Sequence, residues 1–357
     1  MSSSNPSTRQ LRVVAIGGGT GLSTLLRGLK RYVSAPIALR RTTDAPSNPP
    51  SKSSPPTHPD LPCLIRDLAA IVTVTDDGGS SGRLREDLKM LPPGDVRNCM
   101  VALSEDEHLL AKLFQYRFDQ GDLEGHSFGN LFVAALSNIT GDFAQAVQMS
   151  SQILATRGRI YPATNTNVTL AARMDDGSIV RGETNITASK HRIQELMLEP
   201  ADAQPLPGAL EAIANADLIT LGPGSLYTSL ITNLLVHGIP EAIAASKATR
   251  VYVGNLMTQA NESLGLTASQ HIEKIREHNG GARIFDYALI NTAPISPTLL
   301  EQYAREGQLP IEPDLDRIRA LGVEPIPGNF VHEGNVLRHD SDRVTEALLK
   351  IGFAHTP

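Results

Sequence analysis

The sequence predicts an α/β protein with a doubly wound, mostly parallel, Rossmann-like sheet, helices on both faces and an added β-hairpin. Three observations support this fold class. Short β-branched runs alternate with segments of helical periodicity, which is typical of βαβ units. Two of the runs lead directly into glycine-rich loops. One later segment alternates apolar and polar residues around an Asp-Gly turn, which is typical of a hairpin.

The composition is that of a cytoplasmic globular protein. The 357 residues suffice for a large core, and 41% of them are hydrophobic. The formal net charge of −6 argues against a nucleic-acid-binding protein. Cys63 and Cys99 have neither metal-binding nor redox spacing, so a reducing compartment is expected. The N-terminus lacks the apolar segment of a signal peptide, and no apolar run is long enough for a membrane span.

A single domain is predicted over residues 11–352. Residues 1–10 have the composition of a flexible tail. Residues 41–62 are dense in proline and serine, with almost no aliphatic side chains. Such a segment cannot form a packed element, so we interpret it as a disordered surface insertion between the first helix and the second strand.

The predicted elements follow one another along this domain. Strands are expected at 11–16, 69–77, 216–221, 249–256 and 283–291, with the hairpin within 166–184. Helices are expected at 22–31, from 95 onward, at 105–118, 127–138, 142–155 and 209–215, from the second glycine loop to 236, between the last two strands, and at 340–352.

The first glycine loop, Gly17-Gly18-Gly19-Thr20-Gly21, is the strongest candidate for a ligand site. Glycines let backbone N–H groups approach an anion, and the following helix N-terminus adds a favourable field. The loop matches neither the dinucleotide fingerprint nor a Walker A loop, so its pattern alone predicts only an anion cradle. A tight strand-to-helix turn without a ligand is the alternative.

Acidic and basic side chains follow the second strand. Asp76 and Asp77 stand where dinucleotide folds hold a ribose, and two adjacent carboxylates could equally hold Mg²⁺. The glycine-serine stretch that includes Ser81 could wrap a ligand, and Arg83 could pair with a phosphate. Helix capping by the aspartates and a solvated arginine are the alternative.

Two further segments open helices. Asp95 is a candidate N-cap of the helix that it begins. His126 is a candidate general base or phosphate contact, and Asn130, in the same segment, is a candidate ligand contact. Asp76, Asp77 and His126 are the catalytic candidates. A histidine at a helix start is as often structural.

The second glycine loop contains Gly222, Gly224 and Ser225, and it also opens a helix suited to an anion. Asn255 and Asn291 end two further strands and could bind a base or a sugar, although asparagine is also a common turn residue. Two such loops on one sheet predict a ligand with phosphates and a second polar part.

Six segments together resemble the bacterial gluconeogenesis factor family: GGGTGLSTLLRGLK, IVTVTDDGGSSGRLR, PPGDVRN, GHSFGNL, ADLITLGPGSLYTSL and GNLMTQ. The resemblance runs in order over roughly residues 11–350. It implies a fold similar to that of 2-phospho-L-lactate transferase, which moves a phospholactyl group from a guanosine-linked donor onto a deazaflavin precursor. The insertion at 41–62 departs from the family pattern.

The resemblance also implies a function and a site. It implies a cytoplasmic regulator that binds a UDP-sugar, notably UDP-N-acetylglucosamine, and is needed for cell shape during growth on gluconeogenic carbon sources. It places the diphosphate on residues 18–21, nucleotide or sugar contacts after Gly222, and Arg338 at a phosphate. Asp76 and Asp77 match positions where the transferases handle metal and substrate.

Three functions follow for testing. The first is a UDP-sugar-binding regulator, whose partners would be proteins of cell-wall precursor synthesis or a second copy of the chain. The second is a transferase that uses a nucleotide-linked donor with Mg²⁺ at Asp76 or Asp77. The third is a structural protein in which the glycine loops are only turns. The regulator is favoured because the residues after Asp76 match the gluconeogenesis factors more closely than the transferases.

Overall fold

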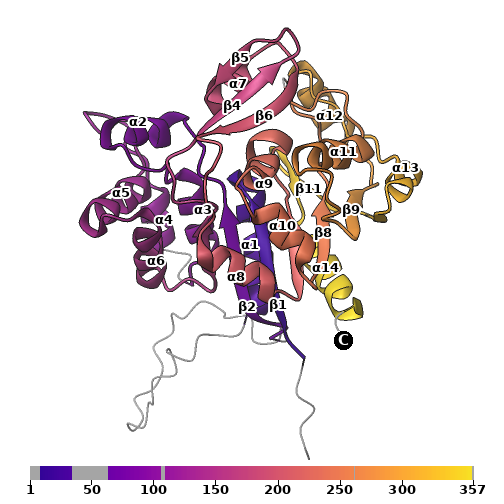
Figure 1. The fold of residues 1–357 in the computed structure, drawn as a ribbon, viewed down its shortest axis with the longest axis horizontal. Helices are drawn as coiled ribbons and strands as arrows, with labels where there is room; N and C mark the ends of the chain where they lie inside the picture. The colour runs from indigo at the N-terminus through magenta and orange to yellow at the C-terminus, as the bar shows by residue number, and fades with distance from the viewer. Residues whose placement is uncertain (1–8, 34–62, 106–108, 261, 356–357) are drawn as a thin grey trace, which may run out of the picture.

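The computed structural model describes residues 9–33, 63–105, 109–260 and 262–355. The segment 41–62, which we interpret as an insertion, lies outside the described residues. Of the predicted tail, only residues 9 and 10 are described. The described chain forms a seven-stranded sheet in the order β10-β9-β8-β7-β1-β2-β3, in which every neighbouring pair is parallel (Figure 1).

The strands belong to three sheets. The main sheet contains β1 (Leu11–Gly17), β2 (Ile65–Val72), β3 (Arg159–Pro162), β7 (Leu218–Leu221), β8 (Thr249–Val253), β9 (Tyr287–Asn291) and β10 (Glu324–Gly328). An antiparallel sheet of order β5-β4-β6 contains β4 (Thr169–Met174), β5 (Ile179–Arg181) and β6 (Ile193–Glu199). A small hairpin pairs β11 (Val331–Glu333) with β12 (Leu337–His339).

The helices connect these strands. They are α1 (Gly19–Leu29), the 3-10 helix η1 (Lys30–Tyr32), α2 (Gly79–Leu88), α3 (Gly94–Leu103), α4 (Leu109–Gln115), α5 (Phe128–Thr140), α6 (Phe143–Ile153), α7 (Glu183–Ala188), α8 (Pro207–Asn215), the π-helix η3 (Leu226–Ile231), α9 (Thr232–Leu234), α10 (Ile239–Ala245), α11 (Ala268–His278), α12 (Pro297–Arg305), α13 (Leu315–Ala320) and α14 (Ser341–His355).

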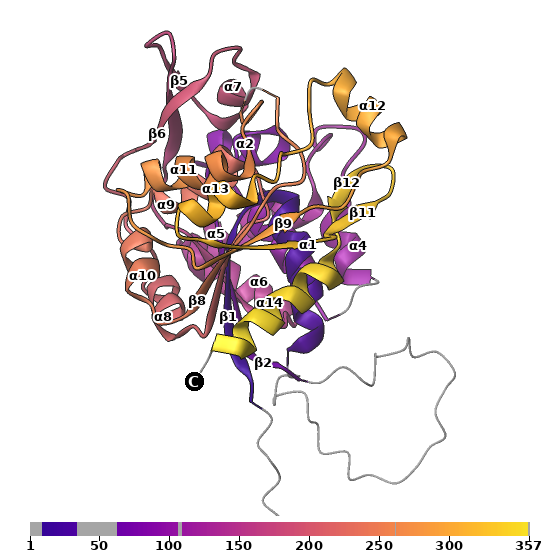
Figure 2. The same cartoon turned by 90° about the vertical axis from the view of Figure 1, so that its right-hand side faces the viewer.

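The main sheet is covered on both faces, as the sequence predicts. Helices α1, α3 and α14 lie on one face, whereas α8 and α10 lie on the other (Figure 2). The strand order reverses at β1, which pairs with β2 on one side and β7 on the other. Ligands of such folds bind at this switch point, beyond the carboxyl ends of the strands.

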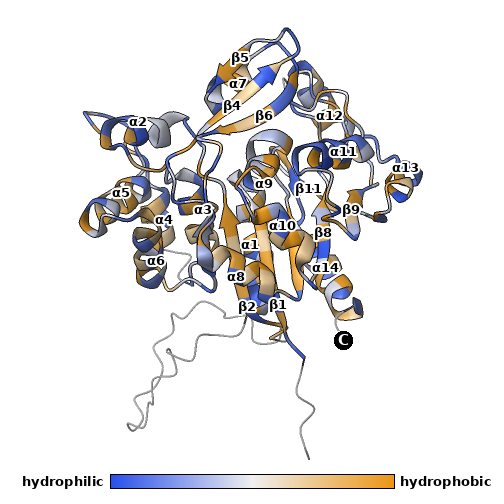
Figure 3. Cartoon of the chain, viewed as in Figure 1, coloured by the Kyte–Doolittle hydropathy of each residue, from blue (hydrophilic) through white to orange (hydrophobic). Residues whose placement is uncertain are grey.

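The core explains why these segments form strands and helices. Val13, Val14 and Ile16 of β1 are at most 2% exposed, as expected for a parallel strand buried on both faces. Leu22, Leu25, Leu26 and Leu29 of α1 are at most 1% exposed, and their spacing forms one apolar stripe against the sheet. Figure 3 shows hydrophobic residues concentrated in the main sheet. No helix in the described part of the chain is long and apolar enough to cross a membrane.

The structure differs from the predicted elements in several respects, and it also contains α2, α7, α12, α13 and the β11–β12 hairpin, none of which was predicted. Strand β2 ends at Val72, so Asp76 and Asp77 lie in the loop that follows and not in the strand itself. The predicted hairpin is part of a three-stranded sheet, because β6 adds to β4. The edge strands β3 and β10 were not predicted, since both are short and contain proline, which sheets tolerate at their edges.

Close packing of α1 on α14 yields a test of the fold. A methyl group on Gly28 would lie 2.5 Å from the carbonyl oxygen of Ser341, in the first turn of α14. We expect Gly28→Ala to lower the free energy of unfolding by about 1–2 kcal/mol, since overpacking outweighs the gain in helix propensity. Urea denaturation measures this change. The control is Gly334→Ala, whose methyl would meet no atom closer than 3.8 Å. Equal stability of the two variants would contradict the packing.

Candidate functional site

A cleft opens at the carboxyl ends of β1, β7 and β8, between the two glycine loops and the β11–β12 hairpin. Its volume is about 250 Å³. Five segments that are far apart in the sequence form its walls, and polar groups predominate among them. The polar and glycine positions are Gly18, Gly19, Thr20, Gly21, Thr24, Gly224, Ser225, Ser229, Asn255, Gln259, Tyr303, Gln308, Arg338 and His339.

The glycines of the first loop are explained largely by packing within the protein. Gly19 has a φ of +61°, which favours glycine. A Cβ on Gly21 would overlap the carbonyl oxygen of Pro223, because the second glycine loop lies directly against the first. A Cβ on Gly18 would lie 2.6 Å from a methyl group of Thr73. The number of glycines is therefore not in itself evidence for a ligand.

The N-terminus of α1 is partly occupied by a carboxylate of the protein. The backbone N–H of Gly19 donates to Oδ2 of Asp95 at 2.7 Å. Among the described residues, the N–H groups of Thr20 and Gly21 have no hydrogen-bond partner, and both residues line the cleft. These two N–H groups are the donors that the helix leaves for an anion.

The sequence predicted that Asp95 caps the helix that it begins, and this prediction is wrong. The N-cap position of α3 is Pro93, which makes no side-chain hydrogen bond, and Asp95 instead caps α1. Burial, together with repulsion from Asp76, raises the pKa of Asp95 to about 6. The hydrogen bond from Gly19 and the charge of Arg97 oppose this increase.

The second glycine loop is also closed by a carboxylate. Glu262 accepts hydrogen bonds from the backbone N–H groups of Tyr227 and Thr228, at the start of η3. Gln259 Nε2 donates to Ser225 Oγ at 2.8 Å. The expectation that this helix N-terminus receives an anion is therefore wrong, because Glu262 already occupies it. Gly224 and Ser225 still line the cleft, whereas Gly222 is not among the lining residues.

Asp76 and Asp77 turn in different directions. Oδ1 of Asp76 accepts from the N–H of Gly78 at 2.9 Å, while its other oxygen faces Gly94, next to Ser81. Oδ1 of Asp77 accepts from both the N–H and the hydroxyl of Thr184, at 2.8 and 2.7 Å. Asp77 thus ties the loop to the start of α7, and Asp76 is the aspartate whose charge acts on Asp95.

Glu183, at the start of α7, joins this acidic group. The hydroxyl of Thr75 lies 3.5 Å from its Oε2. Burial, together with repulsion from Asp95 and Asp76, raises the pKa of Glu183 to about 9. The carboxyl is therefore protonated at neutral pH. The sequence did not predict this residue, because only the docking of the antiparallel sheet brings it to the acidic group.

His126, Asn130 and Arg83 are not brought to the cleft, contrary to the sequence-based expectation. His126 Nδ1 lies 3.1 Å from Ser80 Oγ, which also accepts from Asn130 Nδ2 at 3.0 Å. Arg83 donates to the carbonyl of Glu124 at 2.6 Å. Helix α2 leads away from the cleft, so these side chains join α2 to α5. Burial lowers the pKa of His126 below its usual value.

Arg338 and Asn255 do reach the cleft. Arg338 projects from β12 and is exposed, and within the described residues it makes no salt bridge. His339, beside it, is neutral, because burial lowers its pKa to about 4. The side-chain amide of Asn291 is hydrogen-bonded within its own loop, because it donates to the carbonyl of Ala293 and accepts from the N–H of Phe330. Asn291 therefore stabilises a turn, which was the alternative to binding a base or a sugar.

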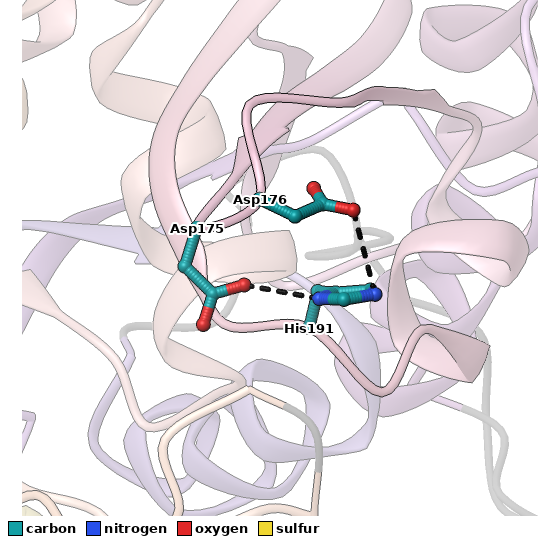
Figure 4. A group of neighbouring side chains, drawn as sticks. All are labelled: Asp175, Asp176 and His191. Carbon is teal, nitrogen blue, oxygen red and sulfur yellow. Dashed lines mark hydrogen bonds and ion pairs between the residues drawn. The ribbon is translucent and has the colours of Figure 1, made fainter.

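A second acidic group lies away from the cleft, on the antiparallel sheet. Within the described ranges, Asp175, Asp176 and His191 form the group of three metal-ligating side chains whose ligand atoms all lie within 4.8 Å of one another. Figure 4 shows His191 between the two aspartates, with Nδ1 3.1 Å from Asp175 and Nε2 3.4 Å from Asp176. The two nitrogens point to opposite sides of one ring, so the arrangement is that of an exposed ion pair. Within the part of the chain that the structure describes, Asp76 and Asp77 belong to no such group.

The buried carboxyl of Glu183 makes the stability depend on pH. Because its folded pKa of about 9 exceeds the ordinary value of 4.5, its favourable contribution is complete below 4.5 and is lost as the pH rises towards 9. We expect Glu183→Gln to be more stable, relative to the unsubstituted protein, at pH 8 than at pH 5, by about 1–3 kcal/mol. Urea denaturation at both pH values measures this. Glu301→Gln, on α12, controls for the lost charge, and an equal change in both variants would contradict the assignment.

Comparison with known proteins confirms the family and the fold. The family model "2-phospho-L-lactate transferase CofD" matches residues 13–331. A gluconeogenesis factor of Halalkalibacterium halodurans is 46% identical, covering 96% of this chain and 97% of that protein. That of Bacillus subtilis is 42% identical, covering 95% and 98%. A crystal structure of a Bacillus halodurans protein matches with a TM-score of 0.85 and 46% identity, covering 96% of this chain and 100% of that one. The chain therefore belongs to the 2-phospho-L-lactate transferase CofD family, as a homologue of the gluconeogenesis factors.

Proposed function

We propose that this protein is a cytoplasmic regulator that binds a UDP-sugar of the UDP-N-acetylglucosamine type and supports cell shape during growth on gluconeogenic carbon sources. Its relatives named gluconeogenesis factor support the cellular role. Partners would be proteins of cell-wall precursor synthesis or a second copy of the chain. The observation that supports this ligand is a single cleft lined by two helix N–H groups, of Thr20 and Gly21, and by Arg338, for which the described part of the chain supplies no hydrogen-bond or salt-bridge partner.

The cleft has the chemistry that a nucleotide diphosphate requires. The N–H groups of Thr20 and Gly21 stand at the positive end of the α1 dipole, where a phosphate is stabilised. Arg338 would add a charged hydrogen bond from the opposite wall. Ser225 and Asn255 line the adjacent wall, where they would bind hydroxyl and amide groups of the ligand.

A transferase is the second candidate, and the acidic group favours it. Asp76 and Asp95 are charged oxygen donors that repel each other, while Glu183 carries a proton at neutral pH. Such a set fits general acid–base work on a group transferred from the cleft. Mg²⁺ would be held by Asp76 and Asp95, and not by the Asp76–Asp77 pair predicted from the sequence; it would neutralise phosphate charge.

Charge at Thr20 tests the phosphate position. Thr20 is exposed, so substitution there should leave the fold intact. We expect Thr20→Glu to weaken the binding of UDP-N-acetylglucosamine at least tenfold relative to Thr20→Gln, because the carboxylate repels the diphosphate. Isothermal calorimetry measures both affinities. Glutamine has nearly the same size as glutamate but no charge. Similar affinities of the two variants would therefore show that the diphosphate does not bind at this loop.

Product analysis separates the regulator from the transferase. The regulator predicts that UDP-sugars raise the melting temperature and remain intact after long incubation with Mg²⁺. The transferase predicts turnover of a guanosine-linked donor, lost in Asp76→Asn and retained in Asp175→Asn, which alters an exposed aspartate of the distant group. If the donor is turned over with this pattern, the protein is a transferase and the proposed regulatory function is wrong.

A further inference from the structure

The two most exposed large apolar side chains of the described residues lie on neighbouring helices, α4 and α5. Leu109 of α4 is 73% exposed, and Ile139 of α5 is 76% exposed. Helix α4 packs on α5 through Phe114, whose ring centroid lies 5.0 Å from that of Phe132. Figure 1 shows both helices, together with α6, at one side of the molecule, and none of their residues lines the cleft. Binding at the cleft therefore does not explain this apolar surface.

Helix α5 has apolar side chains on its outer face as well as on its inner face. Its inner face contains Val133 and Ala134, which are buried. Its outer face consists of two rows of residues spaced four apart, none of which is buried: Leu131, Ala135 and Ile139 in one row, and Phe128, Phe132 and Leu136 in the other. At 3.6 residues per turn, these six positions form one continuous stripe. A helix that is apolar on both faces is normally covered by protein on both.

Charged side chains are missing from this part of the surface. Neither α5 nor α6, which packs against it, contains an aspartate, glutamate, lysine or arginine. Over residues 127–156, Asp142 is the only charged residue, whereas 20% of the whole chain is charged. The exposed polar positions of α6 are glutamines, at 145, 148 and 152. Depletion of charge, together with aromatic and aliphatic side chains, distinguishes the centre of a protein interface from the rest of a surface.

We propose that the outer face of α5 binds the same face of a second copy of this chain, so that the protein is a two-fold symmetric dimer in which α5 of one protomer crosses α5 of its partner at Ala135. An uncharged face meets its own copy without repulsion, whereas a charged partner would find no complementary group on it. Symmetric pairing of one patch with itself is also the commonest arrangement of oligomers.

The side chains of α5 suit such a crossing. The two rows are ridges of the kind that interdigitate when helices cross at about 50°, with each ridge lying in the groove between the ridges of the other helix. Ala135 is the smallest residue of the stripe and stands at the middle of its row, between Leu131 and Ile139. The two helices can therefore approach most closely at this position, while the larger side chains pack on either side of it.

The size of the face is sufficient for a dimer. Helix α5 contains 13 residues, so it is about 20 Å long, and each helix is about 10 Å wide. With α4 and α6 beside it, the face measures roughly 600 Å², so pairing would bury about 1,200 Å² in total, the lower end of the range for specific interfaces. We therefore expect a dimer that dissociates on dilution.

Sedimentation velocity of the full chain over a range of concentrations tests the surface. We expect Ile139→Asp to raise the dissociation constant of the dimer about tenfold or more, because each interface would bury two unpaired carboxylates. The control is Ile179→Asp, which changes an isoleucine of β5 that is 37% exposed and lies outside this face. A monomer at every concentration, or the same dissociation constant in both variants, would overturn the proposal. Both variants should bind UDP-N-acetylglucosamine like the unsubstituted protein, so this result does not depend on the proposed function.

A cross-link tests the two-fold crossing without adding charge to the face. Cys63 is exposed and Cys99 is buried, so Cys63→Ser removes the accessible native thiol. In that background, we expect Ala135→Cys to form a disulfide-linked dimer under mild oxidation, because residues at the crossing point of two helices lie within the reach of a disulfide. Ile179→Cys should remain monomeric on a non-reducing gel. Equal cross-linking of the two variants, or none at residue 135, would rule out the crossing.

Discussion

The hydrogen bond from Gly19 to Asp95 is the contact on which the cleft depends. It joins the start of α1 to α3, which are 76 residues apart in the sequence, and it places a carboxylate at the positive end of a helix dipole. Gly18 has no room for a side chain, since Thr73 and Asp95 lie against it. The shape of the first loop is therefore a consequence of the acidic residue behind it.

The same device closes the second loop, where Glu262 caps the π-helix. Two helices begin at this edge of the sheet, and the protein's own carboxylates bind N–H groups at both starts. The donors that remain, on Thr20 and Gly21, are consequently few and well defined. Arg338 is the charged group on the opposite wall. A ligand with a compact anionic centre and less polar ends matches this distribution better than a polyanion would.

Much of the fold could be predicted from local pattern. The β-branched runs and the leucines of α1 bury the faces that their periodicities indicate, and Asn255, predicted at the end of a strand, lines the cleft. Arg338 also lines the cleft, but it was expected there from the family resemblance and not from local pattern. Glu183 and Glu262 could not be predicted, because their roles arise from packing between distant segments. Arg83, His126 and Asn130 stand in motifs beside site residues, yet their helices direct them into the α2–α5 contact. Proximity in sequence to a glycine loop says nothing about which face of the next helix is turned to it.

The position of Arg338 between the cleft and α14 has a consequence for folding. The cleft brings Thr20 and Arg338 together across more than three hundred residues of chain, and α14, which follows directly, packs on α1. Contacts of such long range form late, since much of the chain must already be ordered. A molecule bound in the cleft would contact both the N-terminal and the C-terminal parts of the domain and so hold them together. Its binding energy would then oppose global unfolding, so occupancy of the cleft would set the lifetime of the whole folded chain.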